Sequence, residues 1–262
     1  MGVLNVTPDS FFDGGRYLDH DAAIRRGRAM IVEGADLVDV GGESTRPGAP
    51  AVSEAEEVRR VMPVVAALAG DVRVSIDTTK PEVARAALSA GATMVNDVSS
   101  SLAAVAAEHG AGYVAMHRKG TPTDMQRDPQ YGDVVAEVAD FLGRRAAEAV
   151  GAGVREVYVD PGIGFGKTVR HNLQLLNALP ALVAAGTPVV IGTSRKSFLG
   201  HIAAGGSPDA VIGDPPPLRA ADRFEGSLAS AVWAMAAGAA IVRVHDVAAT
   251  AQAARLVREV AT

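Results

Sequence analysis

The sequence lacks cysteine, has few aromatic residues and contains no long apolar run, and each shortage excludes a class of protein. Without cysteine there are no disulfides, thiolate metal sites or cysteine nucleophiles. Aromatic residues make up only 4% of the chain, so a core must be built mainly from Val, Leu, Ile and Ala. No apolar run reaches the roughly 18 residues of a membrane span. The net charge of −5 argues against nucleic-acid or membrane-surface partners, and we expect neither.

Eight short apolar runs are each followed by polar residues, and most are then followed by an Ala-rich, helix-like stretch. This alternation predicts an α/β fold, a single (β/α)8 TIM barrel. Such barrels typically have about 250 residues, so we expect one domain, 1–262. Their active sites lie at the C-terminal ends of the strands. The predicted strands are 2–6, 37–40, 72–76, 93–95, 113–116, 157–159, 188–191 and 240–244.

Several helix boundaries are marked by capping residues. Asp19 can cap a helix that reaches residue 33, and Ser53 with Glu56 has the spacing of a capping box. Pro81 opens another helix at a position where its missing N–H costs little. Long stretches with helical patterns also cover 133–150, 224–237 and 248–260, whereas 205–219 is rich in Gly and Pro and predicts an irregular excursion.

Two long Gly-rich loops, 7–17 and 41–50, follow the first two strands, and long polar loops on a rigid barrel commonly serve as lids. The N-terminus enters strand-like sequence at once and shows no signal-peptide pattern. We therefore expect a cytoplasmic protein.

Two carboxylates and an amide stand at strand ends: Asp77, Asp160 and Asn96. An isolated carboxylate there is expensive to desolvate unless it is paired. One interpretation is structural, with an internal salt bridge or a helix N-cap. The other is a ligand that donates hydrogen bonds, and this residue set suits a flat heterocycle with amidine-like N–H edges.

Basic residues also gather at strand ends, namely Arg46, Arg195, Lys196, Arg243 and His245. In an acidic protein this favours an anionic ligand, most simply a phosphate or diphosphate, because Arg offers a planar fork to phosphate oxygens. Arg243 and His245 are two apart on the last strand, so their side chains face the same way. The alternative is a solvated charged rim, although Arg243 is embedded in an apolar strand.

The segment after the seventh strand, from Ser194 to Ser197, predicts the start of a short helix whose N–H groups attract anions. Phe165, in a flexible loop after the sixth strand, can cover an aromatic substrate or pack in the core.

Two apparent signals are rejected. Gly166-Lys167-Thr168 resembles the end of a P-loop, but the first glycine of that pattern is replaced by Pro161. The histidines at positions 109, 171 and 201 have no partner at ligand spacing, so a zinc site is not expected.

Seven motifs stand in one order along the chain, and together they resemble dihydropteroate synthase of the folate pathway, the target of sulfonamides. The stretch 116–122, which begins with Met116, also resembles that family. The motifs are NVTPDSF (5–11), DVGGESTRPG (39–48), SIDT (75–78), NDVS (96–99), DPGIGFGK (160–167), SRKS (194–197) and RVHD (243–246).

The resemblance implies a reaction: 6-hydroxymethyl-7,8-dihydropterin diphosphate and 4-aminobenzoate give 7,8-dihydropteroate and diphosphate, with Mg2+ as cofactor. It also implies sulfonamides as competitive inhibitors and a homodimer, for which the Ala-rich helices 226–237 and 248–260 could provide the interface.

The resemblance implies a role for each matching residue. Asn5 is implied as the ligand of magnesium, and Ser194 and Met116 as substrate-binding residues. For the mechanism we expect diphosphate to leave first and the two loops to close over the resulting cation, with Asp13 as our candidate for a loop carboxylate near it. The pterin positions are Asp77, Asn96, Asp160 and Lys196; the diphosphate positions are Asn5, Thr45, Arg243 and His245; the aminobenzoate positions are Arg46, Pro47, Phe165, Lys196 and Ser197.

Two other functions stay open. A methyltransferase that passes a methyl group from methyltetrahydrofolate to a corrinoid protein would share the pterin carboxylates, but it has no need of the 194–197 segment. A pterin-binding relative without catalysis would be expected to lack Asn5, Arg46 or Arg243, and all three are present.

Overall fold

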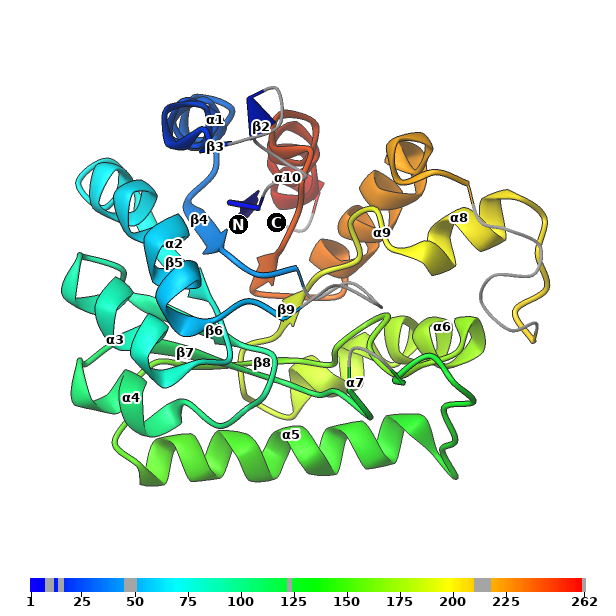
Figure 1. The fold of residues 1–262 in the computed structure, drawn as a ribbon. Coiled ribbons are helices and arrows are strands. Elements are labelled where there is room, and N and C mark those ends of the chain that lie inside the picture. The colour runs from blue at the N-terminus through cyan, green and yellow to red at the C-terminus, as the bar shows by residue number, and fades with distance from the viewer. Residues whose placement is uncertain (8–11, 14–16, 45–50, 122–123, 210–217, 261–262) are drawn as a thin grey trace.

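The computed structural model describes residues 1–7, 12–13, 17–44, 51–121, 124–209 and 218–260, and the predicted barrel is confirmed (Figure 1). Six parallel strands form a continuous sheet in the order β1-β4-β5-β6-β7-β8. Each of the six matches a predicted apolar run to within one or two residues. Their bounds are β1 Gly2–Asn5, β4 Leu37–Gly41, β5 Arg73–Asp77, β6 Met94–Asp97, β7 Gly112–Met116 and β8 Val157–Asp160.

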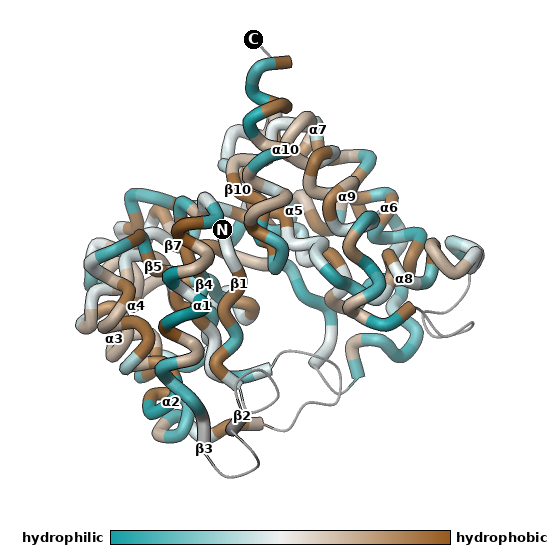
Figure 2. The backbone as a smooth tube through the Cα atoms, turned by 90° about the horizontal axis from the view of Figure 1, so that it is seen from above, coloured by the Kyte–Doolittle hydropathy of each residue, from teal (hydrophilic) through white to brown (hydrophobic). Residues whose placement is uncertain are grey.

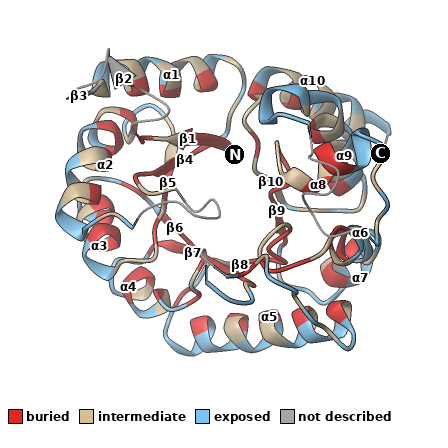
Figure 3. Ribbon diagram, turned by 45° about the vertical axis from the view of Figure 1, so that its right-hand side comes forward, coloured by how far each residue is buried: buried red, intermediate tan, exposed pale blue. Residues whose placement is uncertain are grey.

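The last two strands, β9 (Val190–Ile191) and β10 (Ile241–Val242), form a short parallel pair that closes the ring. A bridge between Val159 and Val189 joins β8 to β9, and a bridge between Gly2 and Val244 joins β10 to β1. Figure 3 shows the strands inside a ring of helices. Both strands are shorter than predicted, although backbone hydrogen bonds continue the pairing beyond them, from the Arg243 N–H to the Ile191 carbonyl and from the Val244 N–H to the Met1 carbonyl.

Helices follow the strands and cover the outside of the barrel, with apolar and polar residues interleaved along them in Figure 2. The outer faces of the strands pack on the helices through buried aliphatic side chains such as Val38, Val74 and Val159. The helices are α1 His20–Val32, α2 Glu54–Leu68, α3 Pro81–Ser89, α4 Ala103–Glu108, α5 Val134–Gly151, α6 Val169–Asn177, α7 Leu179–Ala184, α8 Ser197–Ala203, η1 Ala220–Asp222, α9 Phe224–Ala236 and α10 Val247–Val260.

The predicted helix starts are confirmed at Asp19, Ser53 and Pro81. Asp19 accepts a hydrogen bond from the N–H of Ala22 at 2.8 Å. Ser53 accepts a hydrogen bond from the N–H of Glu56, and the Glu56 carboxylate binds Arg59 and Arg60 of α2. Pro81 occupies the first turn of α3.

The first long loop contains an antiparallel pair that the sequence did not predict, β2 (Phe12–Asp13) with β3 (Tyr17–Leu18). Asp13 therefore lies in β2, and its side chain is outside the described part. Much of both predicted lids, including residues 8–11, 14–16 and 45–50, is likewise outside the described residues. Their closure stays a prediction.

Inside the barrel, the lower layer is apolar. Leu37, Met94, Val114 and Val190 form a buried cluster with Tyr158 and other partly buried side chains. These residues come from β4, β6, β7, β9 and β8, so one layer ties much of the ring together. Inward positions two residues further along each strand therefore lie directly above a closed apolar floor.

Asp97, the last residue of β6, has a structural function although it adjoins the candidate site residue Asn96. Its buried carboxylate accepts hydrogen bonds from the N–H groups of Ser99, Ser101 and Leu102 at 2.6–2.8 Å, and from the Tyr113 hydroxyl at 3.0 Å. These bonds shape the turn between β6 and α4.

Asp97→Ala should lower the free energy of unfolding by about 3 kcal/mol, because several buried donors lose their acceptor at once. Urea denaturation followed by circular dichroism measures this. The control is Asp140→Ala on the exposed face of α5, where Asp140 pairs with Arg144 and the expected loss is below about 0.5 kcal/mol. Equal, small losses in both variants would contradict the structural function of Asp97.

Candidate active site

The layer above the apolar floor is polar and carries the candidate site. Two residues beyond the floor, the strands or their continuations supply Asp39, Asn96, Asp160 and Arg243. The register between β5 and β6 sets Asp77 directly beside Asn96. Because side chains two residues apart face the same way, the periodicity that buries the floor also brings these polar groups together.

Arg243 is the centre of this layer. Its Nε donates to Asp39 Oδ2 and its Nη2 donates to Asp77 Oδ2, both at 2.6 Å. Asp39 is fully buried, and the same oxygen also accepts from Asn96 Nδ2 at 2.9 Å. Since an ionised carboxylate only accepts hydrogen bonds, this contact fixes the orientation of the Asn96 amide. Asn96 therefore presents its oxygen, an acceptor, to the remaining side.

The two predicted carboxylates hold their protons more tightly than usual. Burial raises the pKa of Asp77 to about 7; Arg243 opposes this shift, and the neighbouring Asp39 adds to it. Burial also raises the pKa of Asp160, against the opposing charge of Lys196 and a 2.7 Å hydrogen bond from the Gly162 N–H. Burial by itself lowers the pKa of Arg243, but Asp39 and Asp77 outweigh it and raise that pKa above its usual value.

Lys196, the cap residue of α8, lies against the loop that follows β8. Its Nζ donates to the Ile163 carbonyl and lies 4.7 Å from the centre of the Phe165 ring. Burial lowers the pKa of Lys196 to about 8, and the nearby Asp160 carboxylate opposes this shift. The lysine is thus a cation at neutral pH beside an aromatic face.

His245 and Ser194 meet across the seam between β9 and β10. The Ser194 hydroxyl lies 2.9 Å from His245 Nδ1 and accepts a 3.2 Å hydrogen bond from the His245 N–H. Arg195, predicted as part of an anion-binding set, pairs instead with Asp246 at 2.7 Å. The Asp246 carboxylate therefore largely balances the charge of Arg195, and sequence position alone does not identify such a partner.

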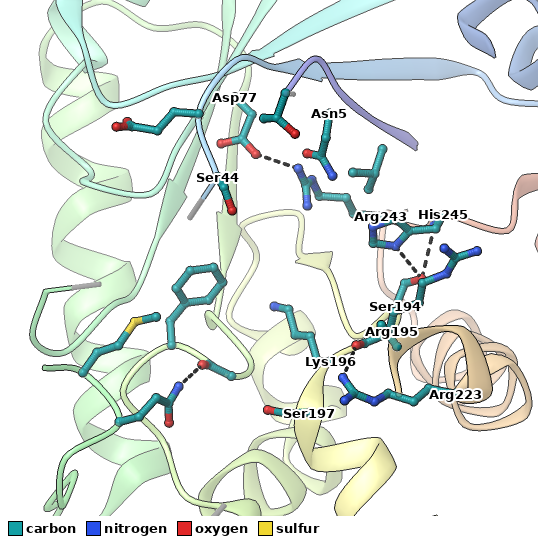
Figure 4. Close-up of a pocket in the computed structure, with 18 residues that line it drawn as sticks. Asn5, Ser44, Asp77, Ser194, Arg195, Lys196, Ser197, Arg223, Arg243 and His245 are labelled. Atoms are coloured by element: carbon teal, nitrogen blue, oxygen red, sulfur yellow. Dashed lines mark hydrogen bonds and ion pairs between the residues drawn. The ribbon is translucent and has the colours of Figure 1, made fainter. Parts of the chain in front are cut away.

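These residues open onto a pocket of about 460 Å³ at the C-terminal ends of the strands. In Figure 4, the side chains of Asn5, Arg243 and Lys196 point toward one space from β1, the continuation of β10 and the start of α8. The lining is Val3, Asn5, Thr7, Glu43, Ser44, Asp77, Met125, Gln126, Gly164, Phe165, Ser194, Arg195, Lys196, Ser197, Ala220, Arg223, Arg243 and His245.

Most predicted site residues that are described line this pocket, namely Asn5, Asp77, Phe165, Ser194, Lys196, Ser197, Arg243 and His245. Asn96, Met116 and Asp160 are buried in or beside the polar layer and are not part of the lining. Thr45, Arg46 and Pro47 lie outside the described residues, as does the side chain of Asp13.

Sequence reasoning did not select Asp39, although it orients both Arg243 and Asn96. A usable signal was present: Asp39 interrupts an apolar strand and faces the same side as Leu37. Arg223 was also missed. It lines the pocket and donates to the Arg195 carbonyl at 2.7 Å, but it comes from the start of α9, far from any strand end.

The described part of the site fits a metal ion only if a bound substrate supplies most of the ligands. Among the described residues, no group of three His, Asp or Glu side chains could hold a metal by itself. Asn5 offers a single amide oxygen on the pocket wall. Mg2+ commonly takes few protein ligands and completes its coordination with water and substrate phosphates, so Asn5 and a diphosphate would suit it.

No described helix is both long and apolar enough to cross a membrane. The sequence matches the pterin binding enzyme family over residues 1–245. It is 48% identical to the dihydropteroate synthase of Mycobacterium leprae over 266 residues, covering 98% of this chain and 91% of that protein.

Solved structures agree with the sequence comparison. A Xanthomonas albilineans dihydropteroate synthase with 4-aminobenzoic acid superposes with a TM-score of 0.88 at 44% identity, covering 100% of this chain and 92% of that one. A Yersinia pestis dihydropteroate synthase with a sulfonamide drug complex gives 0.89 at 41% identity, covering 100% and 93%. The chain belongs to the dihydropteroate synthase family of pterin-binding enzymes and acts in folate biosynthesis.

Proposed function

We propose that the pocket at the polar end of the barrel is where the chain condenses 6-hydroxymethyl-7,8-dihydropterin diphosphate with 4-aminobenzoate. The products are 7,8-dihydropteroate and diphosphate. The observation that supports this location is the meeting of buried acceptors with cationic side chains around one 460 Å³ pocket.

The pterin ring would bind deepest, at the acceptors. Asp77 and Asp160 accept hydrogen bonds from the N–H edge of the aminopyrimidinone ring. Asn96 adds its oxygen, since its Nδ2 already donates to Asp39. Lys196 supplies a donor for the ring carbonyl and a ring nitrogen. Met116, buried at the end of β7, contributes apolar contact below the ring.

The diphosphate would lie toward Arg243, His245 and Ser194, whose donors converge on the pocket. Asn5 would hold Mg2+ together with the diphosphate oxygens, and the ion would lower the negative charge on the leaving group. Thr45 is assigned to this end from the family resemblance.

The aminobenzoate would occupy the side of the pocket formed by Phe165, Lys196 and Ser197. Phe165 offers an aromatic face, while Lys196 and the Ser197 hydroxyl suit a carboxylate. Arg46 and Pro47 are assigned here from the resemblance.

The reaction would begin with cleavage of the bond between the exocyclic carbon and the diphosphate oxygen, which keeps the electron pair. Arg243 and His245 stabilise the growing negative charge. The positive charge on the carbon spreads into the dihydropterin ring, where Asp77 and Asp160 favour it. The lone pair of the neutral arylamine then forms the carbon–nitrogen bond, and the amine proton passes to solvent. Asp13 is assigned near the cation from the resemblance.

Sulfonamides would compete with 4-aminobenzoate, in line with the sulfonamide complex of the Yersinia pestis relative. A homodimer is favoured by large apolar side chains exposed on α9 and α10: Trp233 is 54% exposed, Leu256 67% and Val260 78%. Figure 2 shows the end of α10 projecting beyond its neighbours. The dimer and the cytoplasmic location stay predictions.

The direct test is diphosphate release from 6-hydroxymethyl-7,8-dihydropterin diphosphate with Mg2+, with and without 4-aminobenzoate. We expect 4-aminobenzoate to be consumed in equal amount with diphosphate, as followed by chromatography. Pterin binding with no release and no product would instead support the noncatalytic relative or the methyltransferase.

Asn5→Ala should raise the Mg2+ concentration needed for half-maximal turnover by about tenfold, because one protein oxygen leaves the coordination sphere. Asn5→Asp, which keeps an oxygen at the same place, is the matched control. Its Mg2+ concentration for half-maximal turnover should stay near the wild-type value. An unchanged Mg2+ dependence in Asn5→Ala would rule out Asn5 as a ligand.

Pterin affinity should increase between pH 6 and pH 8, because the Asp77 carboxylate accepts hydrogen bonds best when ionised and its pKa is raised to about 7. Its ionised fraction rises from about 10% to about 90% over this range, so calorimetry should show up to about tenfold tighter binding. Asp77→Asn should bind more weakly and lose most of the slope; the raised pKa of Asp160 leaves a slope of the same sign. A flat wild-type profile would show that Asp77 does not titrate between pH 6 and pH 8. A fall confined to the region near pH 8 would report deprotonation of Lys196, whose pKa is about 8.

A further inference from the structure

Lys167, the residue behind the rejected P-loop resemblance, is fully buried. Its Nζ lies 2.9 Å from His117 Nδ1 and donates to the carbonyls of Gly162 and Phe165 at 3.0 and 3.1 Å, with a longer 3.4 Å contact to the His117 carbonyl. Burying a lysine ammonium among uncharged acceptors costs free energy of folding, so we expect a structural or functional requirement for it. None of the functions proposed above uses it.

The His117 ring is the fixed side of this contact. Burial and, to a smaller extent, the nearby Lys167 together lower the pKa of His117 to about 3, so the ring is neutral near pH 7. Its Nδ1 therefore accepts the hydrogen bond from Lys167. The edge-on contact with Phe141, 5.0 Å between ring centres, holds the ring in place. His117 follows β7 directly, so Lys167 is anchored to the barrel wall.

The other side of the Lys167 contact is the turn from Gly162 to Gly166. Three of its residues, Gly162, Gly164 and Gly166, have positive φ values of 66°, 83° and 64°. A side chain at Gly162 would place its Cβ 1.8 Å from the His117 carbonyl oxygen, so the turn is pressed against the end of β7. Ile163 of this turn packs in the core, and polar contacts hold the rest: the Gly164 N–H donates to Asn172 Oδ1, and Gln126 Nε2 donates to the Gly164 carbonyl. The Lys167 ammonium adds the contact that joins the Gly162 and Phe165 carbonyls.

The 162–166 turn determines the positions of two side chains of the pocket, Phe165 and Lys196. Phe165 is one of its residues, and Lys196 both donates to the Ile163 carbonyl and lies over the Phe165 ring. A Cβ at Gly164 would lie 3.1 Å from Lys196 Cδ, so the lysine stem also rests on the turn. A shift of the turn would therefore move both side chains, whereas Asp77 and Asn96 sit on strands and would stay in place.

We propose that Lys167 is a positioning residue for the second substrate: from beneath the pocket, its ammonium holds the 162–166 turn so that Phe165 and Lys196 keep the aminobenzoate-binding geometry. This rests on the proposed placement of 4-aminobenzoate beside Phe165. It assigns a function to a residue that does not line the pocket and cannot touch a ligand there.

The test is steady-state kinetics of Lys167→Met, which keeps the aliphatic length and removes the charge and the donors. The assays are run at pH 6.5, because burial lowers the pKa of Lys167 to about 7 and the ammonium must be present in the wild type. We expect the KM for 4-aminobenzoate to rise at least tenfold. The KM for the pterin diphosphate should rise no more than about threefold, because Lys196 also contacts the pterin but Asp77 and Asn96 continue to hold it. The matched control is Lys119→Met, a lysine in the loop after β7 that is 47% exposed; both KM values should stay unchanged.

A double-mutant cycle with Phe165→Ala separates positioning from general damage. If Lys167 acts through Phe165, Lys167→Met should add little to the rise in aminobenzoate KM already caused by Phe165→Ala. Hydrogen exchange of the amides of residues 162–166 should become faster in Lys167→Met, with the amides of α5 unchanged.

A parallel rise of both KM values, a fall in thermal stability with normal kinetics, or additive effects in the cycle would overturn the proposal. If Lys167→Met does not fold, the second variant is His117→Phe, which keeps an aromatic ring and removes one acceptor of Lys167. We then expect a smaller rise in KM, limited to 4-aminobenzoate. An inactive wild type would refute the proposed function itself, whereas an active wild type with an unaffected Lys167→Met refutes only this proposal.

Discussion

The pairing of the partly buried Arg243 with Asp39 and Asp77 is the interaction on which the rest of the site depends. Its two 2.6 Å contacts reach from the continuation of β10 across the barrel interior to β4 and β5. Backbone hydrogen bonds join β10 and its continuation to the neighbouring strands, from the Arg243 N–H to the Ile191 carbonyl and from the Val3 N–H to the Val244 carbonyl. The side-chain ion pairs add a connection from this strand across the barrel to β4 and β5, which backbone pairing does not provide, and removing one partner would leave a buried charge uncompensated.

The cluster of Arg243, Asp39 and Asp77 also determines how charge is distributed in the barrel interior. Two carboxylates face one arginine, so the layer above the apolar floor has an excess of acceptors, and Asp77 responds with a raised pKa. Toward the more exposed side, Lys196 and His245 line the pocket with donors. A ligand whose ring donates hydrogen bonds and whose substituent is an anion matches this order of charges from the floor outward.

Much of this arrangement could be predicted because it follows from short-range rules. The alternation of apolar runs and helical stretches predicts the barrel, and the two-residue periodicity of a strand explains why Asp77, Asn96 and Arg243 come together. The seven ordered motifs then identify the family, which the fold alone would not do. The pairing of β2 with β3 was missed because Phe12–Asp13 and Tyr17–Leu18 are too short to show any periodicity.

What the sequence does not determine is which cation serves the ligand and which serves the fold. Arg195, Lys196 and Lys167 all follow strands, and by composition they are equivalent. In three dimensions Arg195 is balanced by Asp246, Lys196 faces the pocket, and Lys167 turns inward beneath Phe165. The difference arises from the backbone: the positive φ values at Gly162 and Gly166 reverse the chain, so that Lys167 points into the barrel wall instead of toward solvent. A lysine's usual exposure is thus overridden by a turn whose shape depends on contacts with His117, about 50 residues earlier in the chain.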